Sequence, residues 1–295
     1  MAATEAFYSA FQPGPLGQRF CLWHADPAHA PGALVVHVHA FAEEMNKSRR
    51  MAALQSRALA AAGSAVLQFD MLGCGDSAGE FSDASWEAWL GDVAGAVALA
   101  RQRHAACWPA SPSPQLWLWG QRAGALLAAA AAERLSEPVN LLLWQPTPSG
   151  KSVLQQFLRL ESAGALLGKG ADKGSARAAL ARGEVAEVAG YPLAPALTQG
   201  LEAASLQAPA LAARLEWLDV SATAALPPTP AAEPVLKAWA EAGWRTRHQT
   251  VAGPSFWQTT EVEEAPALIG ATVEALLSPP GAAAEAAPTL HHLAA

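Results

Sequence analysis

The residues best placed to do chemistry follow an apolar run in the middle of the chain. Gln115-Leu116-Trp117-Leu118-Trp119 leads directly into Gly120-Gln121-Arg122-Ala123-Gly124, and an Ala/Leu-rich stretch follows without a break. A strand, a turn flanked by glycines and a helix make a nucleophile elbow, which presents a central serine above a sheet to attack an acyl group. Here the central residue is Arg122. A guanidinium stays protonated and cannot attack a carbonyl, so the pattern predicts the turn without its nucleophile.

The other two positions of a Ser-His-Asp triad also carry unexpected residues. Such a triad needs an acid in the loop after a later strand and a histidine in the loop after the last strand. The pattern places Thr223 at the acid position and Ser255 at the histidine position. Asp219 falls within the preceding strand, and His248, in the middle of the last strand, is interpreted as an ordinary strand side chain. Three altered positions together predict that acyl-enzyme catalysis has been abandoned.

The backbone groups that stabilise an oxyanion are expected to remain. His39-Ala40-Phe41 occupies the place of the oxyanion loop, so the amides of Phe41 and Ala123 should converge above the elbow, where the next helix begins. With the guanidinium of Arg122 they would form an anion site suited to a carboxylate or a phosphate. The alternative is that Arg122 is paired internally with Glu43 or Glu44 and plugs the pocket. The residues expected around this pocket are His39, Glu43, Glu44, Cys74 and Trp257.

A relocated catalytic group is the second hypothesis, which would make the protein an active ester or thioester hydrolase or an acyltransferase. The candidate nucleophiles are Cys74, Ser77 and Ser255, and His37 or His39 would have to activate them. The glycine-rich pattern around Cys74 and Ser77 is equally explained by a turn.

Composition narrows the class of protein. The chain has 295 residues, of which 52% are hydrophobic and 15% charged, enough to bury the core of a single domain. A net charge of −7, with no basic cluster beyond the run from Lys47 to Arg50, argues against a nucleic-acid surface. Three cysteines without a CxxC spacing favour a reducing compartment. Neither a signal sequence nor a membrane span is evident, so the sequence predicts a cytoplasmic protein. No metal site and no cofactor are predicted.

Strands and helices alternate along the chain, which predicts a mostly parallel sheet with right-handed crossovers. A hairpin is expected over residues 7–25, and helices over 46–62, with Gly63 closing the first, and 86–104, capped by Asp83 or Ser85. Further strands are expected at 33–39, 65–69, 115–119, 139–144, 214–220 and 244–251, and further helices at 233–242 and 261–277.

One segment interrupts this alternation. From residue 149 to residue 209 the strand signal vanishes and amphipathic helices alternate with glycine-containing breaks, which indicates a helical cap inserted between two sheet strands. The predicted organisation is one domain over residues 1–277, with this cap, and an Ala/Pro-rich tail over 278–295 that is expected to be disordered.

From about residue 5 to residue 277 the chain resembles an α/β-hydrolase. Four stretches are similar to the exosortase A system-associated hydrolase 2 family: Phe41-Ala42-Glu43-Glu44-Met45-Asn46-Lys47-Ser48-Arg49-Arg50-Met51, Asp70-Met71-Leu72-Gly73-Cys74-Gly75-Asp76-Ser77, Trp119-Gly120-Gln121-Arg122-Ala123-Gly124 and Gly253-Pro254-Ser255-Phe256-Trp257-Gln258-Thr259. The resemblance implies a bacterial protein linked to exosortase/PEP-CTERM sorting and to exopolysaccharide production.

Three functions remain open at this point. The first is a non-catalytic protein of α/β-hydrolase fold that binds a small anionic or acyl ligand, and the second is the relocated enzyme. The third, which the family resemblance implies, is a structural partner for another hydrolase encoded in the same gene neighbourhood.

Overall fold

The computed structural model describes residues 2–11, 17–166 and 175–278. Its centre is an eight-stranded sheet in the order β1-β2-β4-β3-β5-β6-β9-β10. The two strands at one edge, β1 and β2, are antiparallel, β2 is antiparallel to β4, and the remaining pairs are parallel. The strands are Ala3–Ala10 (β1), Gln18–Ala25 (β2), Ala33–Val38 (β3), Ser64–Phe69 (β4), Gln115–Gln121 (β5), Asn140–Trp144 (β6), Arg214–Ser221 (β9) and Arg245–Ala252 (β10).

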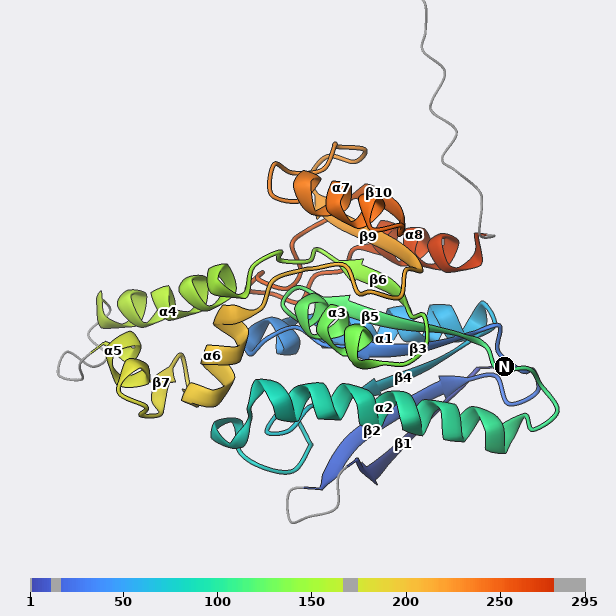
Figure 1. Cartoon of the computed structure of the whole chain (residues 1–295), viewed down its shortest axis with the longest axis horizontal. Helices are drawn as coiled ribbons and strands as arrows, with labels where there is room; N and C mark the ends of the chain where they lie inside the picture. The colour runs from blue at the N-terminus through green and yellow to red at the C-terminus, as the bar shows by residue number, and fades with distance from the viewer. Residues whose placement is uncertain (1, 12–16, 167–174, 279–295) are drawn as a thin grey trace, which may run out of the picture.

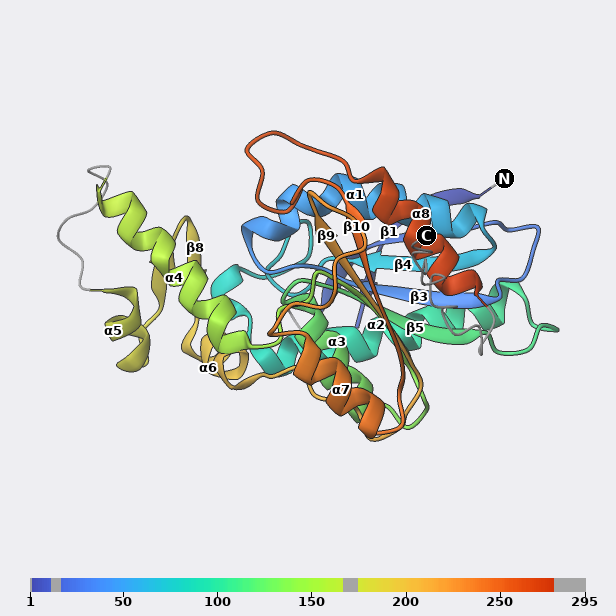
Figure 2. The same cartoon turned by 90° about the horizontal axis from the view of Figure 1, so that it is seen from above.

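Helices cover both faces of this sheet. Figure 2 shows α1 and α8 on one side, with α2, α3 and α7 on the other. Strands β3 and β5 lie in the middle of the sheet and are buried almost throughout, as their dense apolar runs predict. The five helices are Glu43–Ala61 (α1), Trp86–Cys107 (α2), Gly124–Arg134 (α3), Glu233–Glu241 (α7) and Pro266–Leu277 (α8).

The segment between β6 and β9 projects from one end of the sheet (Figure 1). It contains helices Gly150–Leu166 (α4), Ala176–Ala181 (α5) and Pro195–Ala203 (α6). It also contains a short antiparallel pair, Ala186–Val188 (β7) and Tyr191–Leu193 (β8), so the expectation that the segment has no strands is wrong. A bridge between Ser149 and Ser205 closes the base of the segment. With three residues each, β7 and β8 are too short to show a periodic pattern in the sequence.

Several helix ends differ from the sequence expectation. Helix α1 begins at Glu43, three residues earlier than expected, and α8 begins at Pro266, five residues later than expected. Proline is favoured in the first helical turn because it has no N–H group, and an N–H group at that position would have no partner within the helix. Ser85 caps α2, since its hydroxyl oxygen accepts a 3.1 Å hydrogen bond from the amide of Ala88. Apart from Ser278, the predicted tail lies outside the described residues.

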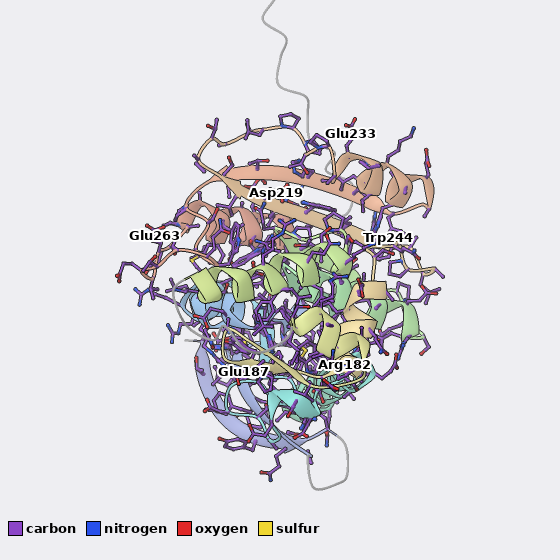
Figure 3. The ribbon with its side chains drawn as sticks, turned by 90° about the vertical axis from the view of Figure 1, so that its left-hand side faces the viewer. Arg182, Glu187, Asp219, Glu233, Trp244 and Glu263 are labelled. Carbon is purple, nitrogen blue, oxygen red and sulfur yellow. The ribbon has the colours of Figure 1, made fainter. Side chains whose placement is uncertain are left out.

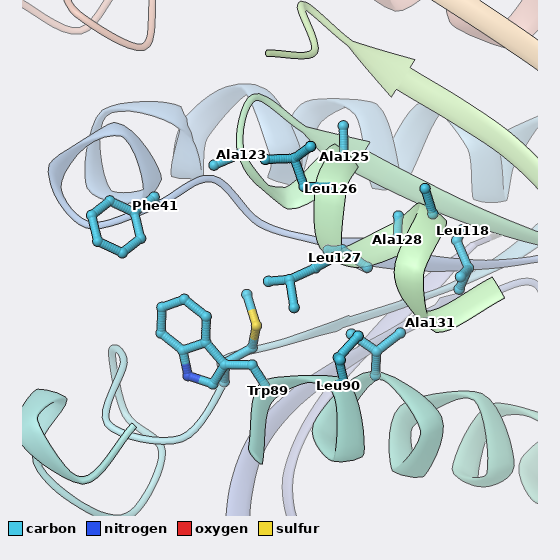
Figure 4. Close-up of a cluster of buried hydrophobic side chains, with 14 of the residues drawn as sticks. Phe41, Trp89, Leu90, Leu118, Ala123, Ala125, Leu126, Leu127, Ala128 and Ala131 are labelled. Atoms are coloured by element: carbon cyan, nitrogen blue, oxygen red, sulfur yellow. The ribbon is translucent and has the colours of Figure 1, made fainter. Parts of the chain in front are cut away.

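The helix after the elbow packs into the larger of two apolar clusters. Leu126 and Leu127 of α3 lie in this cluster with Trp89 and Leu90 of α2, and Figure 4 shows Phe41 at the edge of the same group. The second cluster lies on the opposite face of the sheet, between the strands and helices α1 and α8. The elbow is therefore fixed by the packing of α3 against α2.

The elbow glycines are required by close backbone contacts. A Cβ atom at Gly120 would lie 2.6 Å from the Cα of Ala125, and one at Gly124 would lie 2.3 Å from the carbonyl oxygen of His39. Real Cβ atoms do not approach backbone atoms so closely, so both positions must lack a side chain. The sequence expectation that these glycines leave room for neighbouring backbone is confirmed.

Substituting Gly124 with alanine should therefore destabilise the protein, whereas the same change at Gly270 should not. A Cβ at Gly124 also meets the carbonyl oxygen of Val38 at 2.4 Å, while nothing lies within 4 Å of one at Gly270. We expect Gly124→Ala to lower the free energy of unfolding by about 1–3 kcal/mol or more. Gly270→Ala, in the exposed interior of α8, should raise it by about 0.5–1 kcal/mol. Urea unfolding of both variants tests this, and equal stabilities would contradict the steric argument.

Candidate functional site

The elbow places Arg122 in the strained backbone conformation that a nucleophile normally adopts. Its φ angle is 54°, in the left-handed region that few non-glycine residues enter. Its amide donates a 2.9 Å hydrogen bond to the carbonyl of Trp144, and its carbonyl accepts one of 3.1 Å from the amide of Ala125. These bonds to β6 and α3 hold the turn, so the position is formed although its side chain is an arginine.

The side chain of Arg122 is paired with Glu44. The Nε of Arg122 donates to both carboxylate oxygens, at 3.1 and 3.3 Å, and Nη2 donates to Oε1 at 3.1 Å. Nη1 donates to the carbonyl of Gln145 at 3.2 Å, and the guanidinium carbon lies 5.2 Å from the centre of the Trp257 ring. Both partners are largely buried, with side-chain exposures of 14% for Arg122 and 25% for Glu44. Of the two carboxylates considered as internal partners, the structure therefore joins Arg122 to Glu44.

Glu43 has a different role at the start of the same helix. Its Oε2 accepts hydrogen bonds from Asn46 at 3.2 Å and from the hydroxyl of Tyr191 at 3.1 Å. Tyr191 belongs to β8, so this contact ties the inserted segment to α1. Burial and the nearby carboxylate raise the pKa of the Tyr191 hydroxyl, which keeps it protonated as a donor.

Burial also acts on Glu44. It raises the pKa of this carboxyl above its ordinary value of 4.5, and the charge and hydrogen bonds of Arg122 lower it in part. Because the negative charge of Glu44 and the positive charge of Arg122 offset one another, the floor of the site has little net charge. Arg122 therefore does not present an uncompensated positive charge to a ligand.

A pocket of about 280 Å³ lies over this ion pair, between α1, the elbow and helix α4. Five of its lining side chains are apolar: Phe41, Val153, Phe157, Leu160 and Trp257. The polar lining residues are Glu43, Glu44, Lys47, Arg122, Gln156 and Gln258. His39 and Cys74, which the sequence analysis assigned to this pocket, do not line it. The walls of the pocket are thus mainly apolar, and the ion pair at its base carries little net charge.

The two amides expected to form an oxyanion site border one small cavity. Phe41 and Ala123 both line a space of about 10 Å³, next to Gly124 and Leu127. Within residues 2–11, 17–166 and 175–278, neither amide donates a hydrogen bond to a protein group. Ala123 directly precedes α3, where unpaired helix amides favour negative charge. Two residues with unpaired amides therefore border one small space, which Arg122 does not line.

The sequence analysis assigned the other two triad positions to Thr223 and Ser255. Thr223 is exposed in the loop after β9, and Ser255 lies in the loop after β10. In the described part of the chain, no hydrogen bond joins the side chains of Arg122, Thr223 and Ser255.

Sequence reasoning missed a pair formed by His248 and Asp219. Nε2 of His248 lies 2.9 Å from Oδ2 of Asp219, and Nε1 of Trp217 donates to Oδ1 at 2.9 Å. Figure 3 shows Asp219 on the sheet, seen from the cap end of the molecule. His248 is paired in register with Trp217, so it lies diagonally across from Asp219 on the neighbouring strand. Two polar residues in adjacent predicted strands were the available signal, but the register needed to join them is not visible in the sequence.

Each candidate nucleophile of the relocated mechanism either has a structural role or lacks a neighbouring base. Burial and nearby carboxylates raise the pKa of the Cys74 thiol, so it stays protonated and weakly nucleophilic. The Ser77 hydroxyl donates to the carbonyl of Asp70 and accepts from the amide of Phe20, which fixes the turn. His39 uses both ring nitrogens, with Nδ1 on the carbonyl of Ala40 and Nε2 accepting from the amide of Met71. No histidine among the described residues is hydrogen-bonded to Ser255.

The described residues contain neither a metal-binding cluster nor a membrane-spanning helix. No cluster of three or more His, Cys, Asp or Glu side chains is arranged to hold a metal ion. None of the described helices is both long enough and apolar enough to cross a membrane.

Comparisons with known proteins support the hydrolase-like architecture. The family model for serine aminopeptidase, S33, matches residues 29–166. A serine hydrolase without a lid from Xanthomonas campestris is 16% identical, with a TM-score of 0.54, over 94% of this chain and 97% of that one. A putative hydrolase from Agrobacterium vitis S4 is 16% identical, with a TM-score of 0.53, over 94% and 98%. Est1E from Butyrivibrio proteoclasticus, solved with ferulic acid bound, is 15% identical, with a TM-score of 0.52, over 94% and 95%. No curated protein matches the chain in sequence.

At these identities the solved structures establish the fold. The chain has the α/β-hydrolase fold expected from its sequence, with a mainly parallel central sheet flanked by helices. The more specific resemblance to the exosortase-associated family has no counterpart among these comparisons.

The ion pair at the elbow predicts a pH-dependent stability in an Arg122→Met variant. Without Arg122, the pKa of Glu44 should rise further, because the cation that lowers it is gone. A carboxyl with a raised pKa holds its proton more tightly in the folded state, so the free energy of unfolding falls as pH rises from 4.5 through the folded-state pKa. The destabilisation of Arg122→Met relative to wild type should therefore grow above pH 4.5.

Urea unfolding of both proteins from pH 4 to pH 8 measures this difference. The double variant Arg122→Met/Glu44→Gln is the control, since it lacks the titrating carboxyl and should show a difference from wild type that changes much less with pH. A destabilisation of Arg122→Met that stays constant over this range would show that Glu44 and Arg122 are not coupled.

Proposed function

We propose that this protein binds a small acyl ligand beneath its cap and does not hydrolyse it. The single observation that carries this proposal is Arg122, which occupies the nucleophile position and is held there by Glu44 and by the carbonyl of Gln145. An arginine in this position cannot form an acyl-enzyme. Thr223 and Ser255 at the other triad positions support the same conclusion, because neither supplies an acid or a base.

The shape and chemistry of the pocket favour an acyl ligand. Phe41, Phe157 and Leu160 offer apolar surface to a hydrocarbon chain. Phe41 also borders the small space that Ala123 lines, and the unpaired amides of these two residues are suited to a carbonyl or carboxylate oxygen. Arg122 makes three contacts to Glu44 and one to Gln145, so most of its N–H donors are engaged within the protein. A purely ionic ligand without a chain fits this site less well.

The family resemblance bears on the biological setting. The four stretches that resemble the exosortase A system-associated hydrolase 2 family are the start of α1, the loop after β4, the elbow and the loop after β10. Three of these four contribute residues to the pocket, namely Glu44, Arg122 and Trp257 among others. On this basis we propose a role in exosortase/PEP-CTERM sorting and exopolysaccharide production, with a partner from the same gene neighbourhood. Three free cysteines, Cys21, Cys74 and Cys107, support a cytoplasmic location.

We expect the purified protein to turn over p-nitrophenyl acetate no faster than the buffer does. Arg122→Ser should not restore activity, because a serine without a histidine remains a neutral and weakly nucleophilic hydroxyl. A serine-reactive fluorophosphonate should label neither protein.

Catalysis by a relocated group predicts the opposite pattern. Turnover that survives Arg122→Ala but disappears in Cys74→Ala or Ser255→Ala would establish an active hydrolase or acyltransferase and overturn the non-catalytic proposal. The buried Cys74 thiol and the unsupported Ser255 hydroxyl argue against this result.

Ligand binding should depend on the apolar lining of the pocket. We expect octanoate to bind and Leu160→Asp to weaken it by about tenfold, since an aspartate would replace apolar contact with a charge facing a carboxylate ligand. Val185→Asp is the matched control, because Val185 is similarly exposed, at 52% against 46% for Leu160, and does not line the pocket. Isothermal titration calorimetry measures both. Equal weakening in the two variants, or no binding of octanoate to wild type, would contradict an acyl site beneath the cap.

A further inference from the structure

Strand β1 forms one edge of the central sheet (Figure 1). It pairs with β2 in a continuous register without a bulge, and within the described residues no strand lies on its other side. Its eight residues include no lysine and no proline, and Glu5 is its only charged residue. Natural proteins usually protect an edge strand with lysine, proline, a bulge or a covering segment. β1 therefore offers an open edge to another strand.

The pairing of β1 with β2 shows which backbone groups face this open edge. The amide of Phe11 donates a 3.1 Å hydrogen bond to the carbonyl of Gly17, which extends the register of the two strands. In an antiparallel pair, the residues that exchange hydrogen bonds alternate with residues that do not. Odd-numbered residues of β1 therefore bond to β2, and the N–H and C=O groups of Thr4, Ala6 and Tyr8 point away from it. Within the described residues, these backbone groups have no hydrogen-bond partner.

The opposite edge of the sheet, β10, is partly protected. The carbonyl of Thr250 accepts a 2.8 Å hydrogen bond from the amide of Ala225, and the Thr250 hydroxyl donates to the carbonyl of Leu226 at 3.0 Å. The loop after β9 thus covers one end of β10. This strand also carries two arginines, Arg245 and Arg247. Of the two edges, β1 is the one open to a partner strand.

A second copy of this chain can supply that strand. Two copies related by a two-fold axis place their β1 strands antiparallel, and the residues that face the open edge must then lie opposite one another. The axis must pass through a residue. An axis between Ala6 and Phe7 would set a residue that faces the edge against one that bonds to β2. The axes left to consider near the centre of the strand pass through Glu5, Ala6 or Phe7.

Charge selects among these three axes. Arg103 of α2 pairs with Glu5 and lies 4.3 Å from the centre of the Phe7 ring. An axis through Ala6 places each Glu5 opposite Phe7 of the other copy, so each carboxylate lies beside the Arg103 of both copies. An axis through Glu5 would set the two carboxylates against each other, and an axis through Phe7 would bring the two Arg103 side chains together. Like charges placed opposite one another destabilise a sheet.

We propose that this protein forms a two-fold symmetric dimer through β1, with Ala6 on the axis, so that the two central sheets join into one. The two Ala6 residues exchange both backbone hydrogen bonds, and Thr4 of each copy does the same with Tyr8 of the other. No residue of β1 or β2 lines the pocket beneath the cap, so that pocket is not part of the interface. The dimer does not depend on what the pocket binds.

Charges placed on the axis test this arrangement, because only a residue on the axis faces its own copy. Sedimentation-velocity ultracentrifugation of the wild type over a concentration series should show a monomer–dimer equilibrium. Ala6→Lys and Ala6→Glu should each weaken the dimer by about tenfold or more, since like charges then meet on the axis. An equimolar mixture of the two variants should restore the dimer, because a lysine then faces a glutamate.

The same substitutions at the other edge of the sheet are the matched control. Ala252, at the end of β10, is an exposed strand alanine like Ala6. Ala252→Lys and Ala252→Glu should leave the dimer unchanged. They separate an effect on the β1 edge from a general effect of added charge.

Cysteine cross-linking locates the axis. In a Cys107→Ser background, which removes the exposed cysteine, Ala6→Cys should give a disulfide-linked dimer on mild oxidation. Residues opposite one another in a hydrogen-bonded pair have Cα atoms about 5.5 Å apart, which a disulfide can bridge. Tyr8→Cys is the control, because Tyr8 faces the same edge and is 56% exposed. In the proposed register the two copies of residue 8 are four residues out of step, roughly 14 Å along the strand, and should not cross-link.

Three results would overturn the proposal. The first is a wild-type protein that stays monomeric up to its highest soluble concentration, which would leave the edge to a strand of another protein. The second is a mixture of Ala6→Lys and Ala6→Glu that dimerises no better than either variant alone. The third is Tyr8→Cys cross-linking as readily as Ala6→Cys, which would exclude an axis through Ala6.

Discussion

The ion pair between Arg122 and Glu44 is the interaction on which the site depends. It joins the elbow, a turn with little conformational freedom, to the first turn of α1, and both side chains are largely out of water. Loss of either partner would leave a charge in a poorly solvated place, which is costly, whereas the intact pair contributes only a modest net stabilisation. The pair is therefore better understood as a constraint on geometry than as a source of stability. It determines which groups at the floor of the pocket remain available to a ligand.

Helix α1 separates two cavities. Glu44 and Lys47 line the apolar pocket beneath the cap, while Ser48 and Arg49 line a second cavity between α1 and strands β2, β3, β4 and β5. Neighbouring residues of a helix point in different directions, so one short stretch can serve both. The elbow is divided in the same way, because Gln121 lies in the cavity and Arg122 in the pocket. A shift of the first turns of α1 would thus alter both sites together.

The sequence was sufficient to predict the sheet and the elbow because both depend on local patterns. Dense apolar runs identify buried strands such as β3 and β5, and Gly120 and Gly124 are required by backbone atoms that any elbow brings close. The rest depended on contacts between distant segments. Whether Glu43 or Glu44 meets Arg122 is set by the start of α1, where Ala42 has a φ angle of 50° that no sequence pattern indicates. The pair of His248 with Asp219 depends on strand register.

The backbone of an α/β-hydrolase preserves its oxyanion groups even when its catalytic side chains change. The amides of Phe41 and Ala123 are placed by the ends of β3 and β5 and by the packing of α3, and none of these requires a serine at residue 122. A serine can be replaced by an arginine while two residues with unpaired N–H groups still border the same small volume. Such groups cost free energy when buried without a partner, so the fold itself favours a ligand that carries an oxygen atom there. The non-catalytic proposal is consistent with this division, because the groups that would recognise an acyl oxygen belong to the fold and the groups that would attack it do not.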